Sequence, residues 1–361
     1  MKWLQQATAA AVEQVDAIAA SVQDFPHVTE KNQWTCTPDG VWTGGFWAGL
    51  LWLAQEQQPS AIRLARANAY TQRLLPRARD AHNHDLGFMF FPSAVKGWQL
   101  TGNEEYRRHA IEAAESLAAQ FNPMGGFIPG WGFFGGEDWR GRVLIDTLMN
   151  LPLLVWAVQQ GGPASLMEVV RTHTATALAN HVRPNGSVYH VFRFDPDTGE
   201  PLEGDTYQGK SPESAWARGQ AWALTGLAMI ASRTPDNSYA EASRKVASFF
   251  LSALPEDHIP YWDFDVSGPS EPRDASAGAI ASYGLQKLFD VTGERRYLEA
   301  ATRILQSLAA SCANTPGAPG GVLLHATADL PHGLGIDEST MYGDYYYLKS
   351  LLALKSRSGN A

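Results

Sequence analysis

Helix-length segments of this sequence alternate between two apolar patterns, and this alternation limits the fold more than any other feature. Six segments carry apolar residues on one face and charged residues on the other: 3–21, 60–77, 103–121, 164–181, 237–253 and 294–311. Six others are apolar on nearly every side: 43–55, 86–98, 141–158, 213–231, 274–289 and 338–354. A helix that is apolar all round is buried on all sides, whereas a helix with one apolar stripe lies at the surface. Because the two kinds alternate strictly, the sequence predicts an all-α fold, an (α/α)6 toroid of six helical hairpins with inner and outer rings.

A faint internal repeat supports this arrangement. The segment TGNEEYRRHAIEAAESLAA at 101–119 matches TGERRYLEAATRILQSLAA at 292–310. Repeats of this kind are typical of stacked helix pairs. We therefore expect a single domain over 1–361 with few strands. One minor β-hairpin is expected near 185–201, where NGSVYHVFRFDPDTGEP alternates and ends in a turn signal.

Composition and charge exclude several classes of partner. The chain has 361 residues, of which 45% are hydrophobic and 18% charged, and this suits a soluble protein with a large core. Its net charge is -9 and no basic run occurs, so no nucleic acid is expected as a partner. No membrane association is expected either, since no uncharged apolar stretch reaches the roughly 18 residues that a span needs. An anionic substrate would need local positive charge to offset the overall repulsion.

The N-terminal segment and the cysteines bear on location. The segment MKWLQQATAAAVEQVDAIAASV carries Gln, Glu or Asp every few residues, which is typical of an amphipathic helix and not of a secretory leader. We therefore expect a cytoplasmic protein. Cys36 and Cys312 are far apart in sequence; a bridge between them stays open, but two buried free thiols are the preferred interpretation.

Unusual polar and aromatic side chains recur at the start of the apolar helices. In a ring of helical hairpins all inner helices point the same way, so their N-termini line one mouth of the barrel and favour anions there. At or near these starts stand Trp42, Thr43, His84, Asp85, Asp146, Arg218, Gln220, Trp222, Arg273, Asp274 and Glu338, with Asp344 further in. A solvated surface would not place them at the same end of six helices. The sequence therefore predicts a site at this mouth.

Two aspartates are the candidates for acid–base chemistry. Asp146 interrupts an apolar run, Val-Leu-Ile before it and Leu-Met after the next residue. It either stabilises the start of a helix or has a pKa raised by its apolar setting, which would make it a proton donor near neutral pH. Asp85 is open to the same two interpretations. Paired carboxyl groups are the pattern of glycoside hydrolysis, though by themselves they are not specific.

A metal site is a weaker interpretation. His82 and His84 with Asp85 could ligate zinc or manganese, but no third or fourth ligand is evident, so we expect no metal and no cofactor. The stretch YWDFDVSGPSEPRD at 261–274 holds three aspartates. A solvated loop that ends in a helix cap is the preferred interpretation of it, and a hard cation or a substrate contact is the alternative.

Four other side chains leave alternatives open. Arg218 on a mostly apolar helix needs an anion, which is either an internal carboxylate or a carboxylate of the substrate. His190 is either a core histidine or a ligand. Trp131, in a glycine-rich loop, and Trp222 either fill the core or stack on sugar rings, as the 12 tryptophans of the chain also suggest.

Seven ordered blocks together resemble the unsaturated glucuronyl hydrolases, glycoside hydrolase family 88. The resemblance runs over about 32–350, and seven blocks in one order are far more specific than any one of them. The blocks are WTGGFW (42–47), HDLGF (84–88), LIDTLMNLPLLVWA (144–157), YQG (207–209), SAWARGQAW (214–222), IPYWDFD with RDASAGAIAS (259–282) and ESTMYGDYYYL (338–348).

The resemblance implies a single catalytic domain and an unusual reaction. Polysaccharide lyases leave a uronic acid with a C4=C5 double bond at the non-reducing end, and the family hydrates this vinyl ether. By analogy Asp146 protonates C4 and then takes a proton from the water that adds at C5, while Asp85 holds the sugar and stays ionised beside His84. The remaining site positions are expected to bind the substrate, by holding the uronate, orienting water or stacking on sugar rings: Trp42, His84, Trp131, His190, Gln208, Arg218 and Trp222.

Several rivals remain. An unsaturated rhamnogalacturonyl or ulvan-type uronide hydrolase would run the same reaction on another sugar. An epimerase of the same toroid would use paired histidines, and a catalytically inactive sugar-binding protein would lack the aspartates. The segment 312–337 matches a region that helps relatives choose sulfated substrates, and it has no dense Lys/Arg or Ser/Lys set, so we expect unsulfated substrates. We expect a bacterial enzyme that is a monomer or a weak homodimer.

Overall fold

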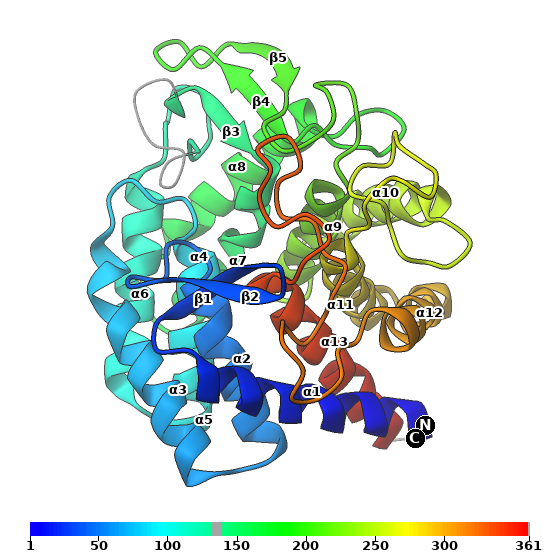
Figure 1. Cartoon of the computed structure of the whole chain (residues 1–361). Coiled ribbons are helices and arrows are strands. Elements are labelled where there is room, and N and C mark those ends of the chain that lie inside the picture. The colour runs from blue at the N-terminus through cyan, green and yellow to red at the C-terminus, as the bar shows by residue number, and fades with distance from the viewer. Residues whose placement is uncertain (131–138, 360–361) are drawn as a thin grey trace.

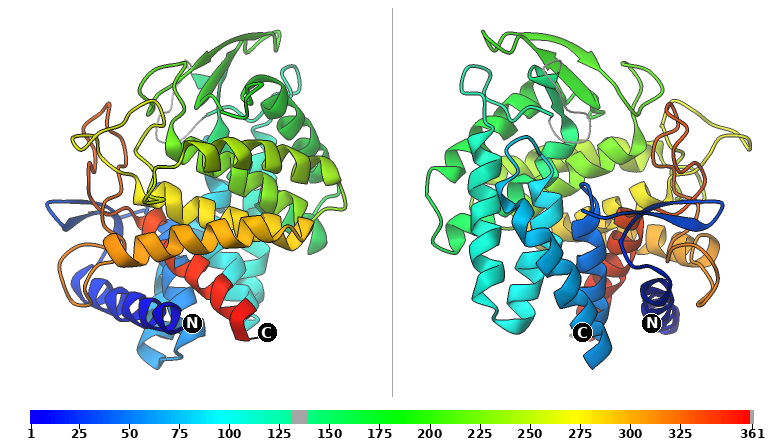
Figure 2. Two further views of the ribbon diagram at one scale, coloured as in Figure 1. Left: turned by 90° about the vertical axis from the view of Figure 1, so that its right-hand side faces the viewer. Right: turned by 60° about the vertical axis from the view of Figure 1, so that its left-hand side comes forward.

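The computed structural model describes residues 1–130 and 139–359 and confirms the two rings of helices (Figure 1). The inner ring consists of α2 (Gly44–Gln57), the run α4, η2 and α5 (Leu86–Phe90, Phe91–Val95, Lys96–Thr101), α7 (Leu151–Gln159), α9 (Ala217–Ala231), α11 (Ala275–Thr292) and α13 (Met341–Gly359). The outer ring consists of α1 (Lys2–Ser21), α3 (Ala61–Leu74), α6 (Glu104–Ala119), α8 (Leu166–Asn180), α10 (Asn237–Ala253) and α12 (Arg295–Ser311). The two further views in Figure 2 show the outer helices from two sides of the molecule.

The inner helices close into a barrel. Each contacts the next, and α13 packs against both α11 and α2, so the last inner helix meets the first. Every residue of α9 is buried, whereas α12 buries a single stripe from Tyr297 through Ile304 to Leu308. Gly45 allows α2 to approach α4, because a Cβ there would collide with the carbonyl groups of Phe88 and Met89. The burial pattern thus follows the apolar pattern of the sequence.

The repeated Thr-Gly pair is the turn between an inner helix and the following outer helix. Gly102 and Gly293 have φ of 68° and 70°, the left-handed conformation that ends α5 and α11. The hydroxyl of Thr101 donates to the carbonyl of Gly97 at 2.7 Å, and that of Thr292 donates to Leu288 at 2.8 Å. The repeat therefore encodes a helix stop followed at once by a helix start.

The third inner helix begins later than the sequence predicted. Residues 142–144 form strand β3 (Arg142–Leu144), and a 3-10 turn, η4 (Ile145–Met149), precedes α7. The apolar residues of this stretch are buried by sheet pairing instead, since β3 pairs with β4 (Val191–Phe194). An apolar run alone does not distinguish a buried strand from a buried helix. This correction places Asp146 in a turn at the end of a strand.

Two small antiparallel sheets lie at one end of the barrel. The expected hairpin forms from β4 and β5 (Pro201–Asp205), and β3 completes a three-stranded sheet in the order β3-β4-β5, at the top of Figure 1. A second hairpin was not predicted: β1 (Phe25–Glu30) pairs with β2 (Gln33–Thr37). Its two turn residues, Lys31 and Asn32, have φ of 53° and 59°, as a tight hairpin turn requires.

Two further expectations can be compared with the fold. Both cysteines are free thiols, as the preferred interpretation had it, but only Cys312 is buried. The expected burial of Cys36 was wrong, because Cys36 is exposed on strand β2. Across residues 1–130 and 139–359, no helix has both the length and the apolar character to cross a bilayer.

Candidate active site

A small cavity lies at the predicted mouth, where the inner helices begin. Trp42 precedes α2, Asp85 precedes α4, Asp146 precedes α7 and Tyr342 is in the first turn of α13. The lining consists of His27, Val28, Trp42, His84, Asp85, Phe88, Leu144, Asp146, Gln208, Ala328, Asp329, Leu334 and Tyr342. Its free volume is ≈ 40 Å³, room for a few water molecules at about 10–15 Å³ each. This volume is smaller than a sugar ring.

Asp146 has the electrostatic setting of a proton donor. Its Oδ1 atom is buried and has no hydrogen-bond partner among the described residues. The pKa of Asp146 is raised to about 8. Burial is the largest cause of this shift and the nearby Asp85 adds to it, whereas Arg218 opposes it. The carboxyl group is thus largely protonated at neutral pH. Asp146 stands in the first turn of η4, but no side-chain hydrogen bond caps the start of that turn.

Asp85 is held by two neighbours on the cavity wall. Its Oδ1 accepts a hydrogen bond of 3.2 Å from Nδ2 of Asn150 and lies 3.4 Å from Nε2 of His84. Asp85 occupies the N-cap position of α4, yet its side chain makes no cap hydrogen bond. Burial raises the pKa of Asp85, while His84, Asn150 and Arg77 lower it by smaller amounts. Burial thus disfavours the charged form of Asp85 and its neighbours favour that form, and the expectation that Asp85 stays ionised stays a prediction.

Arg218 is engaged inside the protein. Its Nη1 atom lies 2.7 Å from Oδ2 of Asp274 and donates to the carbonyl of Thr327 at 2.6 Å, and Nη2 donates to the carbonyl of Ala328. Arg218 and Asp274 are both buried, and Arg218 is not among the described residues that line the cavity. The internal ion pair is therefore present, and a contact of Arg218 with a substrate carboxylate stays a prediction.

His190 and Gln208 are joined through the backbone. Nδ1 of His190 accepts the backbone N–H groups of Tyr207 at 3.2 Å and Gln208 at 3.1 Å, so the ring proton resides on Nε2. Nε2 is buried and has no partner within the described part of the chain. Burial lowers the pKa of His190, with Arg218 adding to the effect, and the imidazole is neutral. Gln208 lines the cavity and donates from Nε2 to the carbonyl of Ala328 at 3.0 Å.

The predicted tryptophans separate into different settings. Trp42 lines the cavity and stacks on Tyr342, with ring centroids 5.3 Å apart and planes at 19°. Trp222 is fully buried behind Phe88, at a centroid distance of 4.9 Å, so it is a core residue in this conformation. Trp131 lies outside the described residues, and its predicted sugar contact stays a prediction.

Several lining residues were not singled out from the sequence. His27 comes from the unexpected β1–β2 hairpin; its Nδ1 lies 2.8 Å from the hydroxyl of Thr43, and burial lowers its pKa to about 4. Tyr342 and Asp329 come from the C-terminal part of the chain, and Asp329 contacts His332 at 2.8 Å. The alternating pattern FPHVTE was the one available signal for the strand that carries His27.

The metal interpretation can be compared with the geometry. Within the described ranges, no group of three or more His, Cys, Asp or Glu side chains is arranged to hold a metal ion. In the loop 261–274, Asp263 accepts hydrogen bonds from the backbone of Lys210 at 2.9 Å and from the hydroxyl of Ser214 at 2.7 Å. Asp274 caps α11 by accepting from the backbone of Ser276. Asp263 and Asp274 therefore have partners inside the protein, and a substrate contact of this loop stays an open alternative.

Known proteins provide an independent comparison. The family model described as Glycosyl Hydrolase Family 88 matches residues 10–311. The chain is 36% identical to an unsaturated chondroitin disaccharide hydrolase of Streptococcus pneumoniae over 342 residues, covering 91% of this chain and 86% of the relative. It is 34% identical to an unsaturated glucuronyl hydrolase of Bacillus sp. GL1 over 342 residues, covering 92% and 91%.

Solved structures agree with the sequence relatives. The crystal structure of unsaturated glucuronyl hydrolase from Bacillus sp. GL1 superposes with a TM-score of 0.93 at 34% identity, covering 98% of this chain and 97% of that one. A structure described as an unsaturated glucuronyl hydrolase specific for heparin also gives a TM-score of 0.93 at 34% identity, covering 99% and 98%. From its fold, its site and these matches, the chain belongs to glycoside hydrolase family 88.

Proposed function

We propose that this protein is an unsaturated glucuronyl hydrolase. It acts on lyase-generated oligosaccharides and releases the 4,5-unsaturated glucuronic acid from their non-reducing end. The observation that carries the proposal is the carboxyl group of Asp146, which lines a cavity, has a pKa raised to about 8 and leaves Oδ1 without a partner among the described residues. A group in this state can give a proton and take one back near neutral pH.

The proposed reaction begins with proton transfer to carbon. Asp146 gives its proton to C4 of the C4=C5 double bond, and positive charge develops at C5 and the ring oxygen. The carboxylate of Asp85, oriented by Asn150 and His84, stabilises that charge. Burial disfavours the ionised form of both carboxyl groups. The positive charge that develops on the substrate therefore stabilises the buried carboxylates, and the carboxylates stabilise it in return.

The second half of the reaction uses the same group as a base. Water adds at C5 and gives its proton to the Asp146 carboxylate, which restores the starting acid. The product is a hemiketal, and its C5–ring oxygen bond and glycosidic bond rearrange to release the remaining sugar and a keto uronate. One carboxyl group therefore serves both steps, as its pKa of about 8 suits.

The charge of the site suits an anionic substrate. A protonated Asp146 removes one negative charge from the mouth, and the N-terminal ends of the inner helices add partial positive charge. Arg218 lies near enough to lower the pKa of Asp146 and so contributes a positive potential even while it pairs with Asp274. A uronate can thus bind despite the net charge of -9 of the chain.

We propose an unsulfated sugar on the leaving side. The segment 312–337 has no Lys or Arg, and its two histidines are paired with carboxylates: His325 with Asp337 at 2.7 Å and His332 with Asp329 at 2.8 Å. A sulfate group would meet acidic side chains there. Rates on sulfated and unsulfated chondroitin disaccharides test this, and a preference for the sulfated disaccharide would contradict it.

We also propose a single catalytic domain that works as a monomer or weak homodimer in the bacterial cytoplasm. The ring needs helices from both ends of the sequence, since α13 packs against α2, and this supports a single domain. The family relatives described above come from bacteria.

Loss of the substrate double bond gives a direct test. Incubation with an unsaturated glucuronyl disaccharide should lower its ultraviolet absorbance, and Asp146→Asn should abolish that decrease while disaccharide binding, measured by calorimetry, persists. A panel with rhamnogalacturonan- and ulvan-derived disaccharides separates the rival substrates. Normal turnover by Asp146→Asn, or binding without turnover by the unaltered protein on every disaccharide, would refute the proposed function.

A further inference from the structure

A second cavity of ≈ 800 Å³ lies at the opposite end of the barrel, where inner helices end. Its walls come from the last turns of α2, the start of α5 and the C-terminal halves of α11 and α13. No described residue lines both this cavity and the candidate active site. Tyr342 belongs to the active site and Lys349 to the second cavity, seven residues along α13, or about 10 Å along the axis. We call this second space the distal cavity.

Cationic side chains dominate the distal cavity. Two carboxylates face it, Glu56 and Asp290. The cations are Lys96, Lys287, Lys349, Lys355 and Arg357. The helix C-termini contribute only about half a negative charge each, which is less than the excess of cations. Such an excess stands out in a chain with a net charge of -9.

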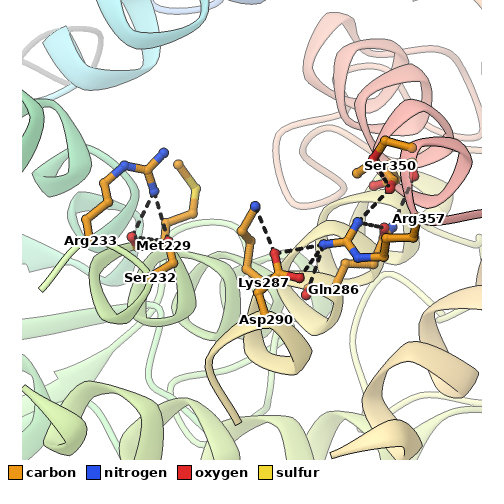
Figure 3. A network of polar contacts seen from close by, with 10 residues as sticks. Met229, Ser232, Arg233, Gln286, Lys287, Asp290, Ser350 and Arg357 are labelled. Atoms are coloured by element: carbon orange, nitrogen blue, oxygen red, sulfur yellow. Dashed lines mark hydrogen bonds and ion pairs between the residues drawn. The ribbon is translucent and has the colours of Figure 1, made fainter. Parts of the chain in front are cut away.

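Both carboxylates are already paired. Glu56 contacts Lys96 at 2.7 Å, and Asp290 contacts Lys287 at 3.1 Å and Arg357 at 2.6 Å. Figure 3 shows Lys287 and Arg357 both turned toward Asp290. For Lys349, no carboxylate of the described residues lies within ion-pair distance. Glu56 is the one carboxylate that favours the charged form of Lys349, and it is already paired with Lys96. An ammonium group at Lys349 therefore has no ion-pair partner of its own among the described residues.

Lys349 is the central group of this cavity. Its Nζ atom donates to the hydroxyl of Tyr345 at 2.7 Å and lies 4.8 Å from the ring centroids of Tyr283 and Tyr345. Burial lowers the pKa of Lys349 well below its ordinary value, and Arg233 and Lys96 lower it further. The aromatic faces stabilise an ammonium group, but they do not neutralise it.

A helix dipole explains some of these cations but not Lys349. Arg357 stands in the last turn of α13, where a basic residue stabilises the helix end. Arg233, after the end of α9, donates to the carbonyl of Met229 and the hydroxyl of Ser232, as Figure 3 shows. Lys349 lies in the interior of α13 and caps nothing. A bound anion would reduce the repulsion between Lys349 and the other cations of the distal cavity.

We propose that the distal cavity binds a tetrahedral oxyanion, phosphate or sulfate, with Lys349 as the inner donor. An oxyanion at this point would accept from the Lys349 ammonium group and be approached by Lys287 and Lys96 at the rim. It would neutralise the repulsion among these cations, and charge-assisted hydrogen bonds of this kind are the strong ones. The volume of ≈ 800 Å³ also leaves room for the sugar of a phosphate or sulfate ester.

Calorimetry on the full chain tests this proposal without any need for turnover. Sodium phosphate and sodium sulfate are titrated at constant ionic strength set with chloride. The unaltered protein should bind one oxyanion saturably, and Lys349→Met should bind at least tenfold more weakly. Lys245→Met removes an equal charge from exposed Lys245 on outer helix α10 and should bind as the unaltered protein does.

The remaining arms separate a folding defect from a binding defect and identify the source of the oxyanion. Lys287→Met, at the rim, should weaken oxyanion binding several-fold. This variant tests the proposal if Lys349→Met does not fold. Glucose 6-phosphate and N-acetylglucosamine 6-sulfate are compared with the inorganic ions: tighter binding of an ester identifies a sugar ester as the ligand, and equal binding identifies the free ion. Absence of saturable binding, or equal binding by the lysine variants, would overturn the proposal.

Discussion

Asn150 holds Asp85 and the start of the second inner helix at the same time. Its Nδ2 donates to Oδ1 of Asp85 at 3.2 Å, while its Oδ1 accepts the backbone N–H of Phe88 at 2.7 Å. Asn150 is buried and lies between η4, which carries Asp146, and α7. One amide side chain therefore links Asp85 and the start of α4 to the segment that follows Asp146.

We predict that Asn150→Ala lowers kcat more than it raises KM. Loss of the donor removes one of the interactions that lower the pKa of Asp85, so its ionised fraction falls. We expect kcat to fall about tenfold, or about 1.4 kcal/mol in the barrier, with the acid limb of the pH profile displaced to higher pH. The unpaired N–H of Phe88 should also destabilise the fold by about 1–3 kcal/mol. Asn180→Ala on outer helix α8 is the control, and an unmoved acid limb in Asn150→Ala would contradict this role.

The pH dependence should report the proton on Asp146. Asp146 must be protonated to act, and its pKa is about 8, so kcat/KM should fall as the pH rises through about 8. The acid limb of the same profile belongs to Asp85, which must be ionised. The profile is measured with an unsaturated disaccharide at constant ionic strength. Activity that keeps rising above pH 9 would show that the proton donor is another group.

Most of the helical architecture could be predicted because burial on all sides leaves a clear sign in the sequence. The residues of α9 are apolar around the whole helix, and this pattern requires neighbours on every side. The β1–β2 hairpin could not be predicted in the same way. Its burial is decided by contacts with distant segments, such as the hydrogen bond from Thr29 to Glu338 at 2.6 Å. Short strands of this kind depend on tertiary contacts more than on their own sequence.

The site was predicted in its carboxyl groups and less well in its supporting residues. Asp85 and Asp146 stood out because each is a carboxyl group beside a long apolar run. For Arg218 the sequence left two partners open, and the choice of Asp274 depends on residues 56 positions apart meeting in space. The burial of Trp222 behind Phe88 depends likewise on ring packing that periodicity does not specify.

We predict that Asp146→Asn makes the folded protein more stable at neutral pH. The folded-state pKa is about 8 and the unfolded value is near 3.8, so the folded state binds the proton more tightly. The stabilisation from that proton is complete below pH 3.8 and is lost progressively as the pH rises toward 8. An amide lacks this loss, and we expect a gain of roughly 1–3 kcal/mol at pH 7, visible in urea denaturation.

Asp344→Asn provides the contrast to that variant. Asp344 is also buried, with a pKa raised to about 7 by burial, but its two oxygens accept the backbone N–H groups of Val322 and Leu323, each at 2.8 Å. An amide cannot accept both with the same two atoms, so Asp344→Asn should destabilise the fold and leave the pH profile of activity unchanged. If both variants were destabilised alike, Asp146 would have a structural role that the geometry does not reveal.

Glu338 should control substrate affinity through the β1–β2 hairpin. Its Oε2 accepts the hydroxyl of Thr29 at 2.6 Å, and its Oε1 accepts the backbone N–H of Lys31 at 2.5 Å. These bonds hold the strand whose residues His27 and Val28 form one wall of the cavity. Because His27 and Val28 line the cavity, the position of this strand decides how closely the wall fits a bound sugar.

We therefore predict that Glu338→Ala raises KM about tenfold with a smaller change in kcat, since Asp85 and Asp146 keep their own supports. Hydrogen exchange of the backbone should accelerate over residues 25–37 and not over η4, which reports on positioning and not on general unfolding. The neighbouring Glu30→Ala, which removes an exposed carboxylate from the same hairpin, is the matched control. A loosened wall should change binding while leaving the reacting groups in place. A tenfold loss of kcat with unchanged hydrogen exchange in the hairpin would therefore mean that Glu338 acts on the chemical step and not on the wall.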